Sequence, residues 1–177
     1  MADPFQRPVA LVGLMGAGKS AVARRLGERF AIAVADLDAM LEAEEGCTIA
    51  ELFEREGEPA FRRRETRRLE QALAAGARLV ACGGGIVLHP AARELLRRRC
   101  RTVWLEVSPR EAARRVRHAG GTRPLLAHGD PEPRLEVLTA QRAPLYAEVA
   151  DLRVSTDGRS ADQVAAAVAQ ALDPGAA

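Results

Sequence analysis

The chain has 177 residues, with 26 basic and 24 acidic side chains and a net charge of +2. A net charge this small argues against a nucleic-acid-binding surface, and no apolar run is long enough to span a membrane. The length suits one domain over residues 1–177, and the first residues lack a secretory signal. Three cysteines, Cys47, Cys82 and Cys100, lack metal-ligand spacing and indicate reduced thiols, with Cys82 in the core. We therefore expect a cytoplasmic monomer with no nucleic-acid or membrane partner.

The most informative segment is residues 13–20, the phosphate loop, which reads G-L-M-G-A-G-K-S and fits the pattern G-x-x-x-x-G-K-[ST]. An apolar stretch precedes it at residues 9–12, and apolar residues at helical spacing follow it over residues 20–30. Glycines between a strand and a helix turn backbone N–H groups toward one centre, where the helix N-terminus adds partial positive charge. We expect Lys19 to reach the β- and γ-phosphates and Ser20 to take a Mg²⁺ coordination position. The residues expected to hold the nucleotide phosphates are Gly16, Ala17, Gly18, Lys19, Ser20 and Ala21.

Apolar strand candidates alternate with helical patterns along the whole chain. Strands are expected at residues 9–12, 31–35, 79–82, 102–107 and 152–155. Helices are expected at residues 20–30, 38–44, 48–55, 59–75, 90–98, 109–117, 133–147 and 160–171. Thr48 with Glu51 predicts a capping box, Ser160 a helix start and Gly76 a helix stop. This alternation predicts a three-layer α/β/α fold around a parallel, five-stranded sheet.

Two stretches fit neither pattern. Residues 119–131 hold glycines, prolines and Arg123 with little periodicity, and an irregular connection of this length is usually functional or disordered. In a phosphotransferase such a segment can be a lid that excludes water from the site, and a plain mobile loop is the alternative. Residues 173–177 are predicted to be a disordered tail.

Polar and glycine residues follow two of the expected strands. Asp36 and Asp38 come at the end of the second strand, where open parallel sheets bind their ligands. Alternation along an extended backbone would aim both carboxylates to the same side, although Asp38 could instead cap a helix. The third strand ends in three glycines, residues 83–85, which would admit a ligand close to the main chain. A flexible turn is the alternative for these glycines.

The candidate anion ligands are Arg62, Arg123 and Arg142. Arg62 precedes Glu65 by three residues, which predicts a helical ion pair that would orient the guanidinium. Taken singly, each of these arginines is more often a surface residue than a ligand, and spacing alone does not select them.

Taken together, these motifs resemble the shikimate kinase family over about residues 9–168. The resemblance rests on residues 13–20, 36–38 (D-L-D), 57–62 (G-E-P-A-F-R), 83–85 (G-G-G), 123–126 (R-P-L-L) and 142–146 (R-A-P-L-Y). It implies a small nucleoside-monophosphate-kinase-like fold. It also implies ATP-dependent phosphorylation of the 3-hydroxyl of shikimate, on the route to chorismate and the aromatic amino acids.

The resemblance implies roles for the reacting groups. Asp36 would hold Mg²⁺ through water, and Asp38 would grip the substrate hydroxyls and take the proton from the attacking one. Arg123 would face the transferred phosphoryl group. The expected catalytic residues are Lys19, Asp38 and Arg123.

The resemblance also implies how each substrate is bound. Arg62 and Arg142 would bind the shikimate carboxylate, with Gly83, Gly84 and Gly85 lining the same pocket. Near the adenine, Arg159 aligns with a contacting loop, and either Arg117 or His118 would stack on the ring.

Three alternatives compete with this interpretation. A gluconate or nucleotide kinase would need a different acceptor pocket from the one that Asp38, Arg62 and Arg142 predict. A relative acting on an aminated or dehydroxylated shikimate could carry the same motifs. A nucleotide-dependent switch or a silent binding module could lose Lys19, Asp38 or Arg123 without penalty, yet all three are present.

Overall fold

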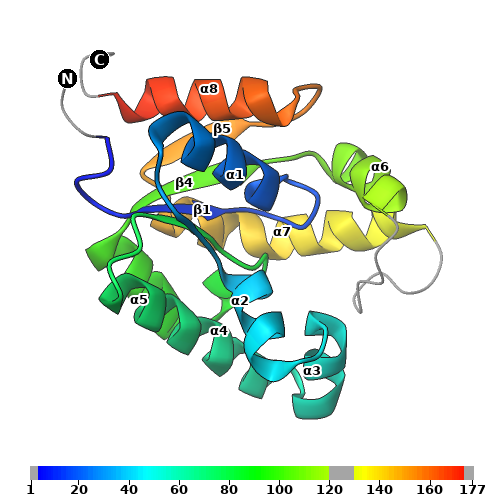
Figure 1. Cartoon of the computed structure of the whole chain (residues 1–177). Helices are drawn as coiled ribbons and strands as arrows, with labels where there is room; N and C mark the ends of the chain where they lie inside the picture. The colour runs from blue at the N-terminus through cyan, green and yellow to red at the C-terminus, as the bar shows by residue number, and fades with distance from the viewer. Residues whose placement is uncertain (1–3, 120–129, 174–177) are drawn as a thin grey trace.

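The computed structural model describes residues 4–119 and 130–173, which form a five-stranded sheet between two layers of helices (Figure 1). All neighbouring strands are parallel, in the order β2-β3-β1-β4-β5. The strands are β1 (Val9–Val12), β2 (Val34–Asp36), β3 (Leu79–Ala81), β4 (Arg101–Glu106) and β5 (Leu152–Ser155). The predicted fold class is therefore confirmed. Strand β2 starts later than the expected residue 31 because Ala31, with a φ of 51°, ends the preceding helix in a left-handed conformation.

Helices follow the strands close to their predicted positions. They are α1 (Lys19–Phe30), α2 (Leu37–Glu45), α3 (Ile49–Glu56), α4 (Glu58–Ala74), α5 (Pro90–Arg99), α6 (Pro109–Ala119), α7 (Pro131–Val149) and α8 (Ala161–Leu172). The 3₁₀ turn η1 (Ile86–Leu88) was not predicted. Thr48 and Ser160 both form capping boxes, and Gly76 follows α4 with a φ of 85°, so these three predictions are confirmed.

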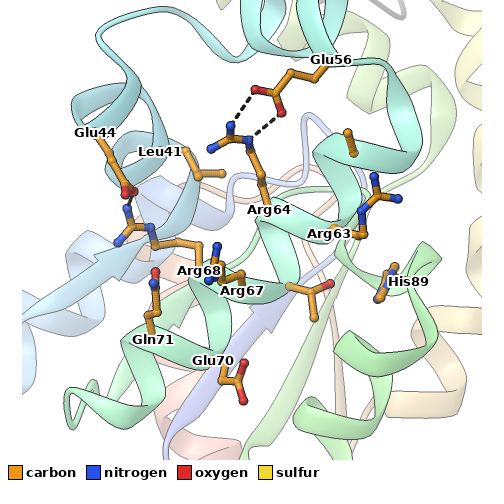
Figure 2. Close-up of a pocket in the computed structure, with 12 residues that line it drawn as sticks. Leu41, Glu44, Glu56, Arg63, Arg64, Arg67, Arg68, Glu70, Gln71 and His89 are labelled. Carbon is orange, nitrogen blue, oxygen red and sulfur yellow. Dashed lines mark hydrogen bonds and ion pairs between the residues drawn. The ribbon is translucent and has the colours of Figure 1, made fainter.

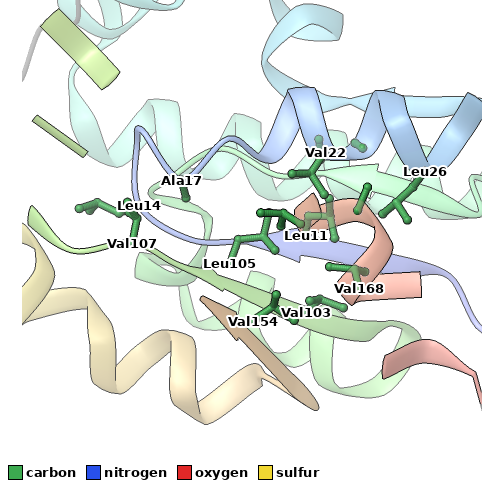
Figure 3. Packing of buried hydrophobic residues seen from close by; sticks show 14 of the residues in the cluster. Leu11, Leu14, Ala17, Val22, Leu26, Val103, Leu105, Val107, Val154 and Val168 are labelled. Carbon is green, nitrogen blue, oxygen red and sulfur yellow. The ribbon is translucent and has the colours of Figure 1, made fainter. Parts of the chain in front are cut away.

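The two faces of the sheet build two separate cores because side chains alternate along each strand. Val9 and Leu11 of β1 face α1 and α8 in one core, which Figure 3 shows around Leu11, Leu105 and Val168. Ala10 and Val12 belong to the other core, with residues of α4, α5 and α7. Helices α1 and α8 cover one side of the sheet in Figure 1, and α4, α5 and α7 cover the other.

A third, smaller core lies where α2, α3 and α4 meet beyond the edge strand β2. It is built on Leu41, Leu52 and Phe61, with the ring of Phe53 at 5.5 Å from that of Phe61. This core fixes α2 and α3 against α4, so the chain immediately after β2 is held beside the first turns of α4.

Other expectations from the sequence have mixed outcomes. Cys47, Cys82 and Cys100 are free thiols, and Cys82 is buried as predicted. None of the helices in the described ranges is long and apolar enough to cross a membrane.

Ala119 is the last residue of α6 and Pro131 the first of α7, so the expected irregular segment is shorter than residues 119–131. Its central part, 120–129, lies outside the described residues, as does 174–177, whereas Asp173 is the C-cap of α8.

Candidate active site

Three strands end level with one another at the carboxyl edge of the sheet. Asp36 pairs in register with Ala81, and Ala81 with Leu11. The segments that follow these strands therefore start side by side, at the edge where parallel sheets bind their ligands. They are α2, the glycine loop (residues 83–85) and the phosphate loop.

The phosphate loop has the backbone geometry of an anion site. Gly13, Gly16 and Gly18 adopt positive φ angles of 144°, 82° and 85°. A Cβ on Gly16 would lie 2.9 Å from Ala112, so the loop packs against α6 at a point where no side chain fits. The Nζ atom of Lys19 donates to the carbonyl oxygens of Gly13 (2.7 Å) and Leu14 (3.0 Å). Helix α1 begins at Lys19, and Ser20 in its first turn is exposed. The N-terminus of a helix favours a negatively charged phosphate.

Asp36 and Asp38 do not share an extended strand, so that prediction is wrong. Strand β2 ends at Asp36, and α2 begins at the next residue, the buried Leu37. It is Asp36 that caps α2, accepting a hydrogen bond from the N–H of Ala39 at 3.3 Å. Asp38 lies in the first turn of α2 and still faces the glycine loop, since a Cβ on Gly83 would lie 2.9 Å from its Oδ1 atom.

Each residue of the glycine loop lies against a different part of the site. A Cβ on Gly83 would overlap Glu65, and one on Gly85 would overlap the guanidinium of Arg62. A Cβ on Gly84 would lie 3.3 Å from the backbone nitrogen of Met15 in the phosphate loop. The loop therefore brings α2, α4 and the phosphate loop into contact with one another.

Two buried arginines reach the glycine loop from separate helices. Arg62 of α4 is 7% exposed, and its Nη1 atom lies 2.5 Å from Oε2 of Glu65, so the predicted helical ion pair is confirmed. Arg142 of α7 is 3% exposed and donates from Nη1 to the carbonyl oxygen of Gly84 at 3.2 Å. The same oxygen accepts a hydrogen bond of 2.5 Å from the hydroxyl of Tyr146, a contact that the sequence did not indicate.

Glu65 is the buried acid of this cluster. Its exposure is 2%, and burial raises its pKa to about 7, against the lowering effect of Arg62 and with a further rise from Asp38. The sequence indicated Glu65 only as a partner of Arg62, because its position beside Gly83 depends on a segment 18 residues away (83 − 65). Asp38, Glu65, Arg62 and Arg142 thus form one electrostatic group.

Arg115 joins the phosphate loop to the turn after β5, and sequence reasoning missed it. Its Nη1 atom donates to the carbonyl oxygen of Gly16 and to Oγ1 of Thr156, each at 3.1 Å. Its Nη2 atom donates to the carbonyl oxygen of Thr156 at 2.5 Å, and its Nε atom to Glu111 at 2.8 Å. The spacing from Glu111 to Arg115 is a signal for a helical pair, but nothing local indicates contacts 41 and 99 residues away.

The residues expected near the adenine lie on the surface. Arg117 pairs with Asp130 at 2.5 Å, and Nδ1 of His118 lies 2.6 Å from the carbonyl oxygen of Arg114. Arg159 is exposed in the turn after β5, where its carbonyl oxygen lies 3.5 Å from Nη2 of Arg115. The choice between Arg117 and His118 stays open. Arg123 lies outside the described residues.

Ser20 and Asp36 carry the oxygens that could hold Mg²⁺. Within the described ranges no three His, Cys, Asp or Glu side chains are grouped to hold a metal. Mg²⁺ in nucleotide sites needs fewer protein ligands, because phosphates and waters complete its shell. Asp36 uses one carboxylate oxygen to cap α2 and Ser20 is exposed, so the donor types fit this ion.

Comparisons with known proteins agree with this geometry. A sequence model of the shikimate kinase family matches residues 15–173. The shikimate kinase of Symbiobacterium thermophilum is 44% identical over 93% of this chain and 95% of its own length. That of Rhodococcus jostii is 43% identical over 87% of this chain and 90% of its own. The structure of Acinetobacter baumannii shikimate kinase in complex with shikimate superposes with a TM-score of 0.87 at 37% identity, covering 94% of this chain and 92% of that one. The chain therefore belongs to the shikimate kinase family.

Proposed function

We propose that this chain transfers the γ-phosphoryl group of ATP to the 3-hydroxyl of shikimate, between the phosphate loop and the glycine loop. The observation that carries the proposal is the approach of Asp38, Arg62 and Arg142 to three consecutive glycines beside the phosphate loop. Shikimate is a small polyhydroxylated carboxylate. It needs forked cations for its acid group and an acceptor for its hydroxyls, and this cluster has both.

Catalysis of this reaction depends on positioning the two substrates and on stabilising the charge of the transferred phosphoryl group. Arg62 and Arg142 hold the acceptor carboxylate, and Asp38 takes the proton as the 3-oxygen forms its bond to the γ-phosphorus and the bond to ADP breaks. Lys19 moves from the loop carbonyls to the β- and γ-phosphates. Ser20 and Asp36 would hold Mg²⁺, which would neutralise phosphate charge.

The nucleotide is held mainly by backbone. The N–H groups of Gly16, Ala17, Gly18 and Ala21 surround its phosphates, as the shape of the loop supports. Arg159 and either Arg117 or His118 contact the adenine. Arg159 lies in the turn that Arg115 ties to Gly16, and Arg117 and His118 follow Arg115 on α6.

Arg123 completes the catalytic group, and its role is inferred from the sequence alone. It stabilises the transferred phosphoryl group in the transition state. Arg123→Ala is expected to lower kcat far more than it weakens ATP binding, because the contact is strongest in the transition state. Equal loss in kcat and in ATP affinity would instead assign Arg123 to nucleotide binding.

We also infer that the protein is a cytoplasmic monomer without nucleic-acid or membrane partners. The net charge of +2 and the free cysteines support this proposal. Sedimentation of the full chain at micromolar concentration is expected to give a single species of 19.0 kDa.

The decisive experiment is an ADP-release assay over a panel of acceptors. The panel holds shikimate, its aminated and dehydroxylated analogues, gluconate and nucleoside monophosphates. Shikimate is expected to give the highest kcat/KM, and Lys19→Ala to lower turnover by several orders of magnitude with an unchanged circular dichroism spectrum. A preference for gluconate or a nucleotide, or wild-type turnover in Lys19→Ala, would refute the proposal.

A further inference from the structure

A second concave site lies on the outer side of α4 (Figure 2). This α4 groove has a volume of about 680 Å³ and is lined by Leu41 and Glu44 of α2, Glu56 of α3, Arg63 and Arg67 of α4, and His89. Its size falls within the usual range for small-molecule sites, roughly 300–1,000 Å³. We propose that the α4 groove binds a small oxyanion, a metabolite that carries a phosphate or several carboxylates.

The first argument is a surplus of positive charge in the groove. Four arginines of α4 line it, and two of them are neutralised: Arg64 pairs with Glu45 (2.5 Å) and Glu56 (2.6 Å), and Arg68 pairs with Glu44. Arg63 and Arg67 are exposed and have no ion pair or hydrogen bond among the residues that the structure describes.

The positions of these two free guanidinium groups suit an anion. They lie one helical turn apart, where like charges repel, so an anion between them would relieve a local electrostatic cost. One acid of the lining, Glu70, is also without an ion pair within residues 4–119 and 130–173, so the two free guanidinium groups and this carboxylate leave one positive charge in excess. Guanidinium forks match phosphate and carboxylate oxygens in pairs.

The second argument is a pair of buried nitrogens that lack partners. Nε of Arg68 and Nδ1 of His89 are both buried on the groove wall, and neither has a hydrogen-bond partner in the described part of the chain. Buried polar atoms are rarely left in this state, because each one costs free energy. Both nitrogens can act as donors, Nδ1 in the tautomer that carries its hydrogen. A shift of the Arg68 and His89 side chains toward a bound anion would expose these nitrogens, and the oxyanion oxygens would then accept from them.

The α4 groove is distinct from the active site although the two share a helix. Arg62 and Glu65 lie buried against the glycine loop, whereas Arg63 and Arg67 are exposed to solvent. Thr66 lines the groove and donates its hydroxyl to the carbonyl oxygen of Arg62. An anion in the groove would therefore contact the outer side of the helix that carries Arg62, one of the two arginines of the acceptor clamp (Arg62 and Arg142).

The test measures binding directly, so its outcome is independent of kinase activity. The full chain is saturated with Mg·ADP and shikimate, which removes the phosphate loop and the clamp as competing sites. Inorganic phosphate and citrate are then titrated separately by calorimetry. At least one of them is expected to bind with a stoichiometry of one. The double variant Arg63→Gln/Arg67→Gln is expected to bind at least about tenfold more weakly, because two charge-assisted contacts are lost.

Two further variants make the test decisive. Arg98→Gln, which removes an exposed arginine of α5, is expected to bind like the wild type and controls for net charge. Arg63→Lys/Arg67→Lys keeps the charge without the fork and is expected to be intermediate, which keeps the test valid if the glutamine variant misfolds. Binding of phosphate alone or citrate alone would identify the ligand class. Equal affinity in wild type and both double variants, or no binding of either ion, would overturn the proposal.

Discussion

Arg142 is a buried cation that the protein itself leaves only partly compensated. Arg62 has Glu58 at 2.9 Å and Glu65 at 2.5 Å, whereas Arg142 has no ion pair in the described ranges and bonds to the carbonyl oxygen of Gly84. A buried charge is costly unless it is paired. Arg142 is therefore the side chain best placed to gain from a substrate carboxylate, and Arg62 is held in position beside it.

Replacing Arg142 should weaken binding of the acceptor and leave binding of the nucleotide unchanged. Arg142→Ala is expected to raise the acceptor KM by the equivalent of about 2–5 kcal/mol, as for loss of one partner in a desolvated charge pair, with the ATP KM unchanged. Arg142→Lys should recover only part of this loss. Arg134→Ala, an exposed arginine on the same helix, serves as the control. An unchanged acceptor KM in Arg142→Ala would remove Arg142 from the clamp.

Among the elements, the glycine loop sets the spacing between the clamp and the phosphate loop. Gly85→Ala would push its methyl group into the Arg62 guanidinium, so the acceptor KM is expected to rise at least about tenfold while the ATP KM is kept. Gly76→Ala is the control, because Gly76 has a positive φ of 85° and open space around it. It should lower stability by about 1–2 kcal/mol without changing either KM. Similar acceptor KM values in the two variants would show that the close contact is unimportant.

The turn after β5 depends on Arg115 for its position beside the phosphate loop. Arg115→Gln is expected to raise the ATP KM and to speed hydrogen exchange at residues 156–159, because the link between Gly16 and Thr156 is lost. Arg114→Gln is a matched control: Arg114 also pairs with Glu111 but makes neither of these two contacts. If both variants behave alike, the effect comes from Glu111 and not from the link.

For the whole molecule, the sequence predicted the elements better than the contacts between them. The phosphate loop, the parallel sheet and the capping boxes were predictable because each depends on a local pattern. The start of α2 at Leu37 was missed because an extended backbone was expected from Asp36 to Asp38. The roles of Arg115 and Tyr146 depend on residues 41 to 99 positions away, and a local sequence pattern does not predict such contacts.

Glu65 links the active site to the stability of the whole chain. Its pKa is raised from 4.5 to about 7 in the folded state, so between these pH values the native state binds one proton more than the unfolded state. The contribution of Glu65 to the free energy of unfolding must then fall as pH rises from 4.5 to about 7, by up to about 1.4 kcal/mol per pH unit. Glu111 acts in the opposite sense: Arg114 and Arg115 lower its pKa to about 2, which stabilises the fold as pH rises above that value.

The contribution of Glu65 can be isolated by comparing variants across this pH window. Glu65→Gln is expected to abolish the pH-dependent fall in unfolding free energy that Glu65 causes. The difference in unfolding free energy between the variant and the wild type should therefore change steadily from pH 4.5 to 7 and be constant above pH 7. Glu70→Gln removes an exposed acid of the same helix and is the control for the loss of one carboxylate. Urea midpoints at half-unit intervals of pH provide the measurement. Parallel curves for Glu65→Gln and the wild type would mean that Glu65 is already ionised at pH 4.5, held in that state by Arg62.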